Sequence, residues 1–126
     1  MVIEYFQIRK FKKEFKKLKK KYKTLDTDLE NVKRFAIEMF HIQNINNNSC
    51  FRIPGFKSYH CEIYKIKKFA CKALKGRGKN SGIRIIYAYF PEKKQVHFIE
   101  IYFKGNKENE DKERIEEFIK EYCEND

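Results

Sequence analysis

Residues 83–90 carry apolar side chains at both alternating sets of positions. One set is Ile83, Ile85, Tyr87 and Tyr89, and the other is Arg84, Ile86, Ala88 and Phe90. A strand with this pattern is buried on both faces, which is typical of a central strand in a sheet. Arg84 is its one charged residue. Because an unpaired buried guanidinium is costly, Arg84 is predicted to lie where the sheet opens towards a ligand or partner.

Three other segments have strand-like patterns, at residues 2–7, 61–69 and 95–103. Residues 91–94 are short enough for a hairpin, so the strands on either side of them are predicted to be antiparallel. By the two-residue period of a strand, Lys65 and Lys67 share one face. Together with Arg84 they are predicted to place three cations on one side of the sheet.

Apolar residues recur at helical spacing in three segments. The first begins near Lys10, the second near Asp26 or Thr27, and the third lies close to the C-terminus. Their apolar stripes are Phe11, Phe15, Leu18 and Tyr22; Leu29, Val32, Ala36, Met39 and Phe40; and Ile115, Phe118, Ile119 and Tyr122. The predicted order is β-α-α-β-β-β-α. This order is that of an α+β fold in which an antiparallel sheet of about four strands packs against an N-terminal helix hairpin.

The 126 residues fit a single domain spanning residues 1–126. The formal net charge is +11, from 29 Lys and Arg residues against 18 Asp and Glu residues. A cationic field of this kind attracts polyanions such as nucleic acid, an acidic membrane surface or an acidic protein. The lysines of the first predicted helix have two interpretations: a solvated helix face, or steering of a polyanion towards the site.

Metal and histidine chemistry find little support in the sequence. The cysteines form no CxxC pair and have no histidine at zinc-finger spacing, so we expect reduced thiols, no metal and no other cofactor. They are Cys50, Cys61, Cys71 and Cys123. The three histidines, His41, His60 and His97, are scattered and form no nucleophile–base pattern. We interpret them as structural or solvent-facing.

Membrane insertion is also not supported. The chain has no apolar run of about 18 residues, and Glu4, Arg9 and Lys10 interrupt any signal-peptide core at the N-terminus. The expected location is therefore the cytoplasm, without a membrane partner.

The lysine- and glycine-rich stretch at residues 75–82 differs from a nucleotide-binding loop. The Walker A motif is GxxxxGK[ST] and leads into a helix, whereas Gly76–Ser81 has neither that spacing nor the terminal Lys-Ser pair and leads into a strand. The remaining interpretation is a cationic loop that holds phosphates without reading sequence. Its candidate RNA-binding residues are Lys72, Lys75, Arg77 and Lys79. The alternative is a hairpin connection whose lysines only maintain solubility.

Four motifs occur here in a characteristic order: Tyr64-Lys65-Ile66-Lys67, the run Lys75–Gly82, Gly82-Ile83-Arg84-Ile85-Ile86-Tyr87, and Ile99–Gly105. In this order and spacing the chain resembles the RelE/ParE superfamily of bacterial and archaeal toxins. The resemblance implies a ribosome-dependent mRNA endoribonuclease, a hydrolase-type toxin held in check by a cognate antitoxin. Its partners would be that antitoxin, mRNA and the ribosome. It assigns catalytic roles to Lys65, Lys67 and Arg84.

The resemblance also implies a basic residue just after the last strand, which falls at Lys104 or Lys107. We take Lys107 as the catalytic candidate, and Lys104 and Tyr102 as RNA-binding candidates. Several active members of the family place a tyrosine after this strand to stack on the nucleotide. Here residues 106–111 contain none, and Tyr102 or Tyr122 is the possible substitute.

The implied reaction is RNA cleavage without a metal. The ribose 2′-oxygen attacks the adjacent phosphorus, and fixed cations stabilise the charge that gathers on the phosphoryl oxygens. Crowding of Lys65 and Lys67 beside Arg84 is expected to lower the lysine pKa values, so that a lysine can accept the 2′-proton. Glu100 is a candidate partner for Arg84 or a neighbouring lysine. The alternative interpretation is that these cations are ordinary surface charges.

Two further functions remain open from the sequence. One is a ParE-type inhibitor of DNA gyrase that catalyses no reaction, and the other is a non-toxic nucleic-acid-binding module.

Overall fold

The computed structural model describes residues 2–46, 48–56, 60–67, 69–73 and 81–122. Its elements in chain order are β1 (Glu4–Gln7), α1 (Arg9–Lys21), α2 (Leu25–Val32), the π-helical segment η1 (Lys33–Glu38), α3 (Met39–His41), β2 (Cys50–Arg52), β3 (Glu62–Ile66), β4 (Ile83–Phe90), β5 (Gln95–Phe103) and α4 (Lys112–Tyr122). Among these residues, no helix is long and apolar enough to cross a membrane.

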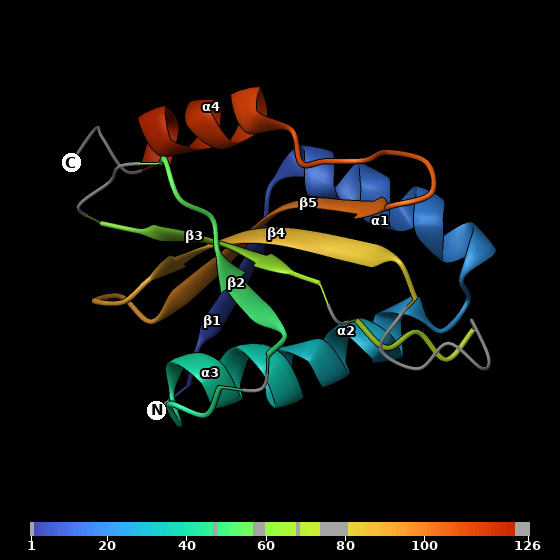
Figure 1. The fold of residues 1–126 in the computed structure, drawn as a ribbon, viewed down its shortest axis with the longest axis horizontal. Coiled ribbons are helices and arrows are strands. Elements are labelled where there is room, and N and C mark those ends of the chain that lie inside the picture. Colours follow the sequence, from blue (N-terminus) through green and yellow to red (C-terminus); the bar gives the residue numbers. More distant parts are fainter. Residues whose placement is uncertain (1, 47, 57–59, 68, 74–80, 123–126) are drawn as a thin grey trace.

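The strands form one sheet in the order β1-β5-β4-β3-β2 (Figure 1). The predicted antiparallel hairpin of β4 and β5 is confirmed, and β3 pairs antiparallel with β4. The α+β class is confirmed as well. Two details differ from the sequence-based prediction, because β2 is a fifth strand and β1 pairs parallel with β5. A three-residue strand is too short to show a two-residue period, and local patterns do not determine the relative direction of strands far apart in sequence.

One face of the sheet is covered by α1, α2, η1 and α3. The ring of Phe11 in α1 stacks on Phe98 of β5 at a centroid distance of 5.2 Å, and both side chains are fully buried. The predicted stripe of the second helix contributes the buried residues Leu29, Val32 and Ala36. We call this side the helical face.

The opposite face is covered by α4, which lies across the sheet from α2 and α3 (Figure 1). Ile115, Phe118 and Ile119 of α4 are buried in a cluster with Ile86 and Phe90 of β4. We call this side the α4 face. Among the described residues, its cover consists of α4, a helix of 11 residues, with Ile53 and Phe56 packed against the same cluster.

The segment between β5 and α4 turns back across the α4 face. The sheet beneath it carries a register shift between Ile86 and Tyr87, opposite β5. Glu100 lies opposite Ile86, and its carboxylate accepts a hydrogen bond from the Asp111 amide at 2.9 Å. The start of α4 is therefore fastened to the middle of β5.

Candidate functional site

Lys65, Lys67 and Arg84 come together on the α4 face, and we call them the cationic cluster. Lys65 lies opposite Ile86 in the antiparallel pairing of β3 with β4, which places Lys67 beside Arg84. The Arg84 Nη1 donates hydrogen bonds to the carbonyl of Lys67 at 2.9 Å and to that of Ile83 at 3.3 Å. The predicted proximity of these residues thus results from strand register.

Arg84 is half-buried at the start of β4. Its recorded hydrogen-bond partners are backbone carbonyls, and within the described ranges it makes no ion pair. A carbonyl orients a guanidinium without cancelling its charge. Arg84 therefore keeps its full positive charge for an anion arriving from solvent.

Lys67 follows the end of β3 and is exposed. Its amide donates a hydrogen bond to the carbonyl of Ser49 at 3.2 Å, so the backbone position is fixed by the segment before β2. Its ammonium lies 4.9 Å from the ring centroid of Phe51 in β2. Among the residues that the structure describes, no carboxylate pairs with Lys67.

Lys65 is in a different situation, because its Nζ donates to Glu110 Oε1 at 2.8 Å. The side chains are 14% and 12% exposed, so the ion pair is largely withdrawn from water. Burial by itself lowers the pKa of Lys65, but the interactions with Glu110 and Tyr102 outweigh it and raise this pKa above its ordinary value. The expectation that crowding lowers the pKa of Lys65 is wrong, because the sequence pattern did not reveal the carboxylate.

Lys107 forms a second ion pair, with the fully buried carboxylate of Glu100. Its ammonium also lies 5.6 Å from the ring centroid of Tyr102. The expected pairing of Glu100 with Arg84 or a neighbouring lysine thus occurs with Lys107, and Arg84 is not neutralised by it. A lysine that balances a buried carboxylate has a structural role in addition to any contact with a substrate.

Tyr102 is 6% exposed. Its buried hydroxyl makes no hydrogen bond of good geometry within the described residues, although it is close enough to Lys65 to influence the pKa of that lysine. Burial raises the pKa of Tyr102 itself. The expectation that Tyr102 provides a stacking surface disagrees with this burial, because its ring is covered.

Of the remaining RNA-binding candidates, Lys104 lies near the start of β4, Lys72 lies beside α2 of the helical face, and the others are outside the described residues. Lys104 is exposed in the turn after β5, and its amide bonds the carbonyl of Gly82 at 2.8 Å, just before β4. Lys72 is exposed, and its amide lies 3.3 Å from both carboxylate oxygens of the buried Asp28. The expectations for Lys75, Arg77 and Lys79 concern residues outside those that the structure describes.

His41 belongs to the helical face, away from the cationic cluster. Its Nε2 is 2.8 Å from the hydroxyl of Tyr87, and its ring stacks on Tyr89 at a centroid distance of 3.9 Å. Burial, with a smaller contribution from Lys94, lowers the pKa of His41 to about 4. These contacts agree with the structural interpretation of His41.

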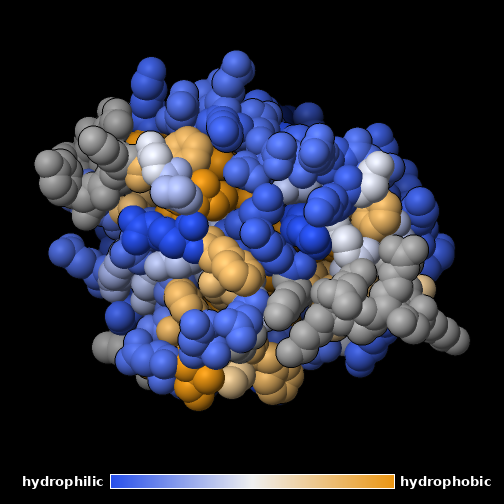
Figure 2. Space-filling view, in the orientation of Figure 1, coloured by the Kyte–Doolittle hydropathy of each residue, from blue (hydrophilic) through white to orange (hydrophobic). Residues whose placement is uncertain are grey.

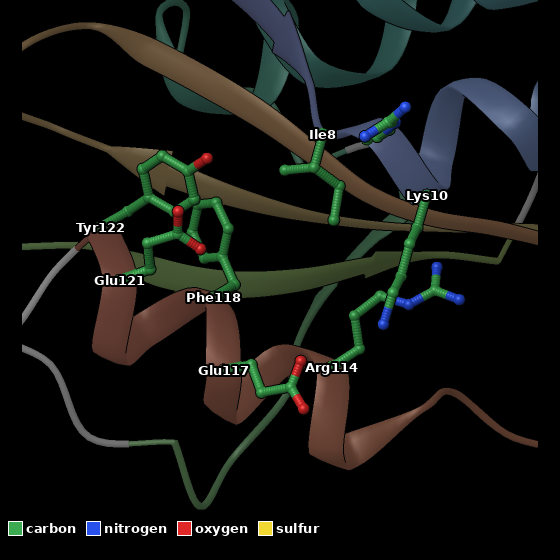
Figure 3. A pocket seen from close by; sticks show the side chains of 8 residues that line it. Ile8, Lys10, Arg114, Glu117, Phe118, Glu121 and Tyr122 are labelled. Carbon is green, nitrogen blue, oxygen red and sulfur yellow. The ribbon is translucent and has the colours of Figure 1, made fainter.

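Two hollows lie on the α4 side of the molecule. One, of about 250 Å³, lies between the start of α1 and α4, with Lys10 and Arg114 on its wall together with Glu117 (Figure 3). Its charges are mixed, and Arg114 is held by Glu14 at 2.8 Å. The other, of about 360 Å³, lies beside Glu110 and the segment after β2. The surface in the view of Figure 2 is largely hydrophilic, with hydrophobic patches near its centre.

No protein-family model matches the chain, and no curated protein matches its sequence. Among solved structures, a variant of the Escherichia coli toxin RelE with two arginine-to-alanine substitutions, in the free state, has a TM-score of 0.50 at 22% sequence identity, covering 98% of this chain and 100% of that chain. A chain of the archaeal RelE–RelB complex from Pyrococcus horikoshii OT3 has a TM-score of 0.49 at 11% identity, covering 83% of this chain and 98% of that chain. The likeness to the first structure shows that this chain has the RelE toxin fold.

Proposed function

We propose that this chain, which has the fold of a RelE toxin, is the toxin of a toxin–antitoxin pair and cleaves mRNA at the ribosome as a single domain. The observation that supports this proposal most is the contact between Lys67 and Arg84 on the α4 face. Neither side chain is neutralised by a carboxylate within the described part of the chain. Two such cations from neighbouring strands can bind the oxygens of one phosphate.

In the proposed reaction, the ribose 2′-oxygen attacks the adjacent phosphorus and the bond to the 5′-oxygen breaks. Arg84 contacts two phosphoryl oxygens through its planar fork, and stabilises their charge as the transition state forms. Lys65, whose pKa is raised, is an ammonium at neutral pH and can donate a proton to the departing 5′-oxygen. Lys67 contributes its ammonium to the phosphate together with Arg84, and the proton of the 2′-hydroxyl passes to solvent water.

The proposed antitoxin contact follows from charge. The chain carries a formal net charge of +11, and an acidic segment of a cognate antitoxin would be attracted to the cationic cluster. Covering Lys67 and Arg84 would block the phosphate site. Lys104, exposed after β5, would extend the RNA contact at the cluster without reading sequence, and Lys72, exposed beside α2, would add a more distant phosphate contact. The proposed location of all these partners is the cytoplasm.

The test is induced expression of the chain in bacterial cells, with and without the neighbouring gene. Parent protein is expected to stop growth and yield cleaved mRNA, and co-expression of the antitoxin is expected to restore growth. Arg84→Ala is expected to abolish growth arrest, with antitoxin binding kept by Lys67 and the remaining positive charge of the chain. Because Arg84 also holds the Lys67 carbonyl, Lys67→Ala serves as a second variant that leaves that backbone bond intact. The control is Lys13→Ala on the exposed side of α1.

An Arg84→Ala and a Lys67→Ala protein that are both as toxic as the parent would overturn the proposed mechanism. Failure of DNA replication with trapped gyrase, before any loss of intact mRNA, would favour the ParE-type alternative. Harmless induction together with sequence-independent binding of nucleic acid would favour a non-toxic binding module.

A further inference from the structure

Phe51 has an unusual position for a large apolar residue. It lies in β2, the outer strand of the sheet, directly opposite Lys65 in the pairing with β3. It is 36% exposed, although burial of an aromatic ring is favourable and the α4 face offers apolar contacts nearby. Directly opposed residues on neighbouring strands point to the same side of a sheet. The Phe51 ring is therefore on the α4 face, beside the cationic cluster.

The ring is also linked to the two unneutralised cations of that cluster. The Lys67 ammonium is 4.9 Å from the ring centroid, and the Lys67 carbonyl accepts the hydrogen bond from Arg84 at 2.9 Å. The structure thus presents an exposed aromatic surface in β2, an ammonium just after β3 and a guanidinium in β4. This arrangement matches a nucleotide, in which an aromatic base is joined through its sugar to an anionic phosphate.

The other exposed apolar residues in the described ranges do not lie beside the unneutralised cations Lys67 and Arg84. The exposed set is Val2, Phe6, Phe35, Ile45, Phe51 and Tyr122. Phe35 has its own cation, since the Arg34 guanidinium lies 5.9 Å from its ring centroid, but it belongs to η1 on the helical face. Tyr122 packs on Phe118 and His97. Tyr102 contacts Lys107 but is covered, as described above.

We propose that Phe51 is a positioning residue whose ring stacks on a base of the RNA strand when an adjacent phosphate is held by Lys67 and Arg84. This inference rests on the proposed function and adds to it the contact that orients the strand. Aromatic stacking tolerates every base, because each base has a π-face, and purines offer the larger surface. The cations would hold the phosphate, while Phe51 would set which nucleotide lies at the cluster.

The experiment measures mRNA cleavage in a purified translation system with the 126-residue chain. Phe51→Ala and Phe51→Leu are expected to lower kcat/KM by about tenfold, the order of one lost base stack. Phe51→Tyr and Phe51→Trp are expected to retain activity within about twofold, since they keep an aromatic face. The leucine variant separates stacking from simple apolar packing. Phe35→Ala is the matched control, because it removes an exposed ring beside a cation on the other side of the sheet.

Two further readings separate stacking from a structural effect. The unfolding temperatures of the Phe51 variants are expected to stay within about 2 °C of that of the parent, because Phe51 is partly exposed. The distribution of cleavage sites along the mRNA is expected to differ from that of the parent in Phe51→Leu. In Phe51→Trp it is expected to match the parent. A ring that served only the fold would alter the unfolding temperature and leave the cleavage sites unchanged.

The outcomes distinguish this inference from the proposed function. If the parent cleaves mRNA and Phe51→Leu cleaves the same sites at the same rate, the role of Phe51 is overturned and the proposed function stands. If the parent cleaves no mRNA in the translation system, the proposed function fails and the role of Phe51 fails with it. Loss of activity in Phe51→Tyr and Phe51→Trp equal to that in Phe51→Ala would also overturn the stacking role.

Discussion

The two faces of the sheet differ in how their polar groups are satisfied. On the helical face, His41 and the hydroxyl of Tyr87 lie 2.8 Å apart within an aromatic cluster, and Tyr87 is fully buried. On the α4 face, Lys67 and Arg84 hold charges that no carboxylate within the described residues cancels. The same strands supply both faces. Both faces bury an apolar cluster, and the α4 face in addition carries charged groups able to meet a ligand.

The α4 face is itself divided between neutralised and unneutralised cations. Glu110 and Glu100 hold Lys65 and Lys107, and both carboxylates belong to β5 or to the segment that leads from it to α4. Lys67 and Arg84 have no such carboxylate partner within the described residues, so their charges are not cancelled. The position of one connection therefore determines which cations of the α4 face are neutralised by a carboxylate.

The largest expected effect concerns the helical face. Phe98→Ala removes a fully buried ring that packs on Phe11 and Tyr5, and is expected to lower the free energy of unfolding by about 4 kcal/mol. Urea unfolding followed by circular dichroism measures it. Phe51→Ala on the opposite face is the control, with an expected loss below about 1 kcal/mol. Equal losses of unfolding free energy in Phe98→Ala and Phe51→Ala would contradict the proposed difference between the two faces.

Next in size is the ion pair beneath the β5–α4 segment. Lys107→Ala leaves the buried Glu100 carboxylate without its cation, and we expect a loss of about 2 kcal/mol, since Lys107 is itself partly exposed. The double variant Glu100→Gln with Lys107→Met removes both charges and is expected to recover most of this stability. The urea midpoints of unfolding of the parent, of Lys107→Ala and of the double variant test this expectation. A stable Lys107→Ala protein would contradict the structural role of Lys107.

A pH effect of about 1 kcal/mol is expected from His41. Its pKa is lowered from 6.5 to about 4 in the folded chain, so between these values the unfolded chain binds the additional proton. Stability is therefore expected to fall as the pH drops from about 6.5 towards 4, with the effect reduced by the partial exposure of the ring. Thermal unfolding across this range is the measurement. In His41→Gln the corresponding part of the pH dependence should disappear; a profile identical to that of the parent would show that His41 is not its source.

The smallest effect concerns the division within the α4 face. Burial opposes the raised pKa of Lys65, and Glu110→Gln removes one of the two groups that raise it, so this pKa is expected to fall from its value in the parent, as titration followed by nitrogen NMR of the lysine can measure. Freed from its ion pair, Lys65 is expected to strengthen binding to single-stranded RNA by about twofold to threefold, with a steeper salt dependence. Glu116→Gln on the exposed side of α4 is the control. Unchanged RNA binding and salt dependence in Glu110→Gln would show that Lys65 is not restrained by Glu110.

The ion pair itself also has a pH dependence with a defined sign. The Glu110 pKa is lowered from 4.5, because the bond with Lys65 outweighs the opposing effect of burial. Its contribution to stability is thus present above pH 4.5 and is lost as the pH falls through the lowered pKa. The raised pKa of Lys65 makes its contribution present below pH 10.5 and lost above it.

The sequence by itself determined the strands at residues 83–90 and 95–103, the apolar stripes of the helices, and the common face of Lys65, Lys67 and Arg84. Each of these follows from a short repeat, because a two-residue or helical period depends only on near neighbours. The tertiary structure decided which distant residues and strands these segments contact. Glu110 meets Lys65 across 45 residues of chain, β1 runs parallel to β5, and Phe51 stands beside Lys67 because a three-residue strand joins the sheet edge. Such partners are set by packing of distant segments, and no local period records them.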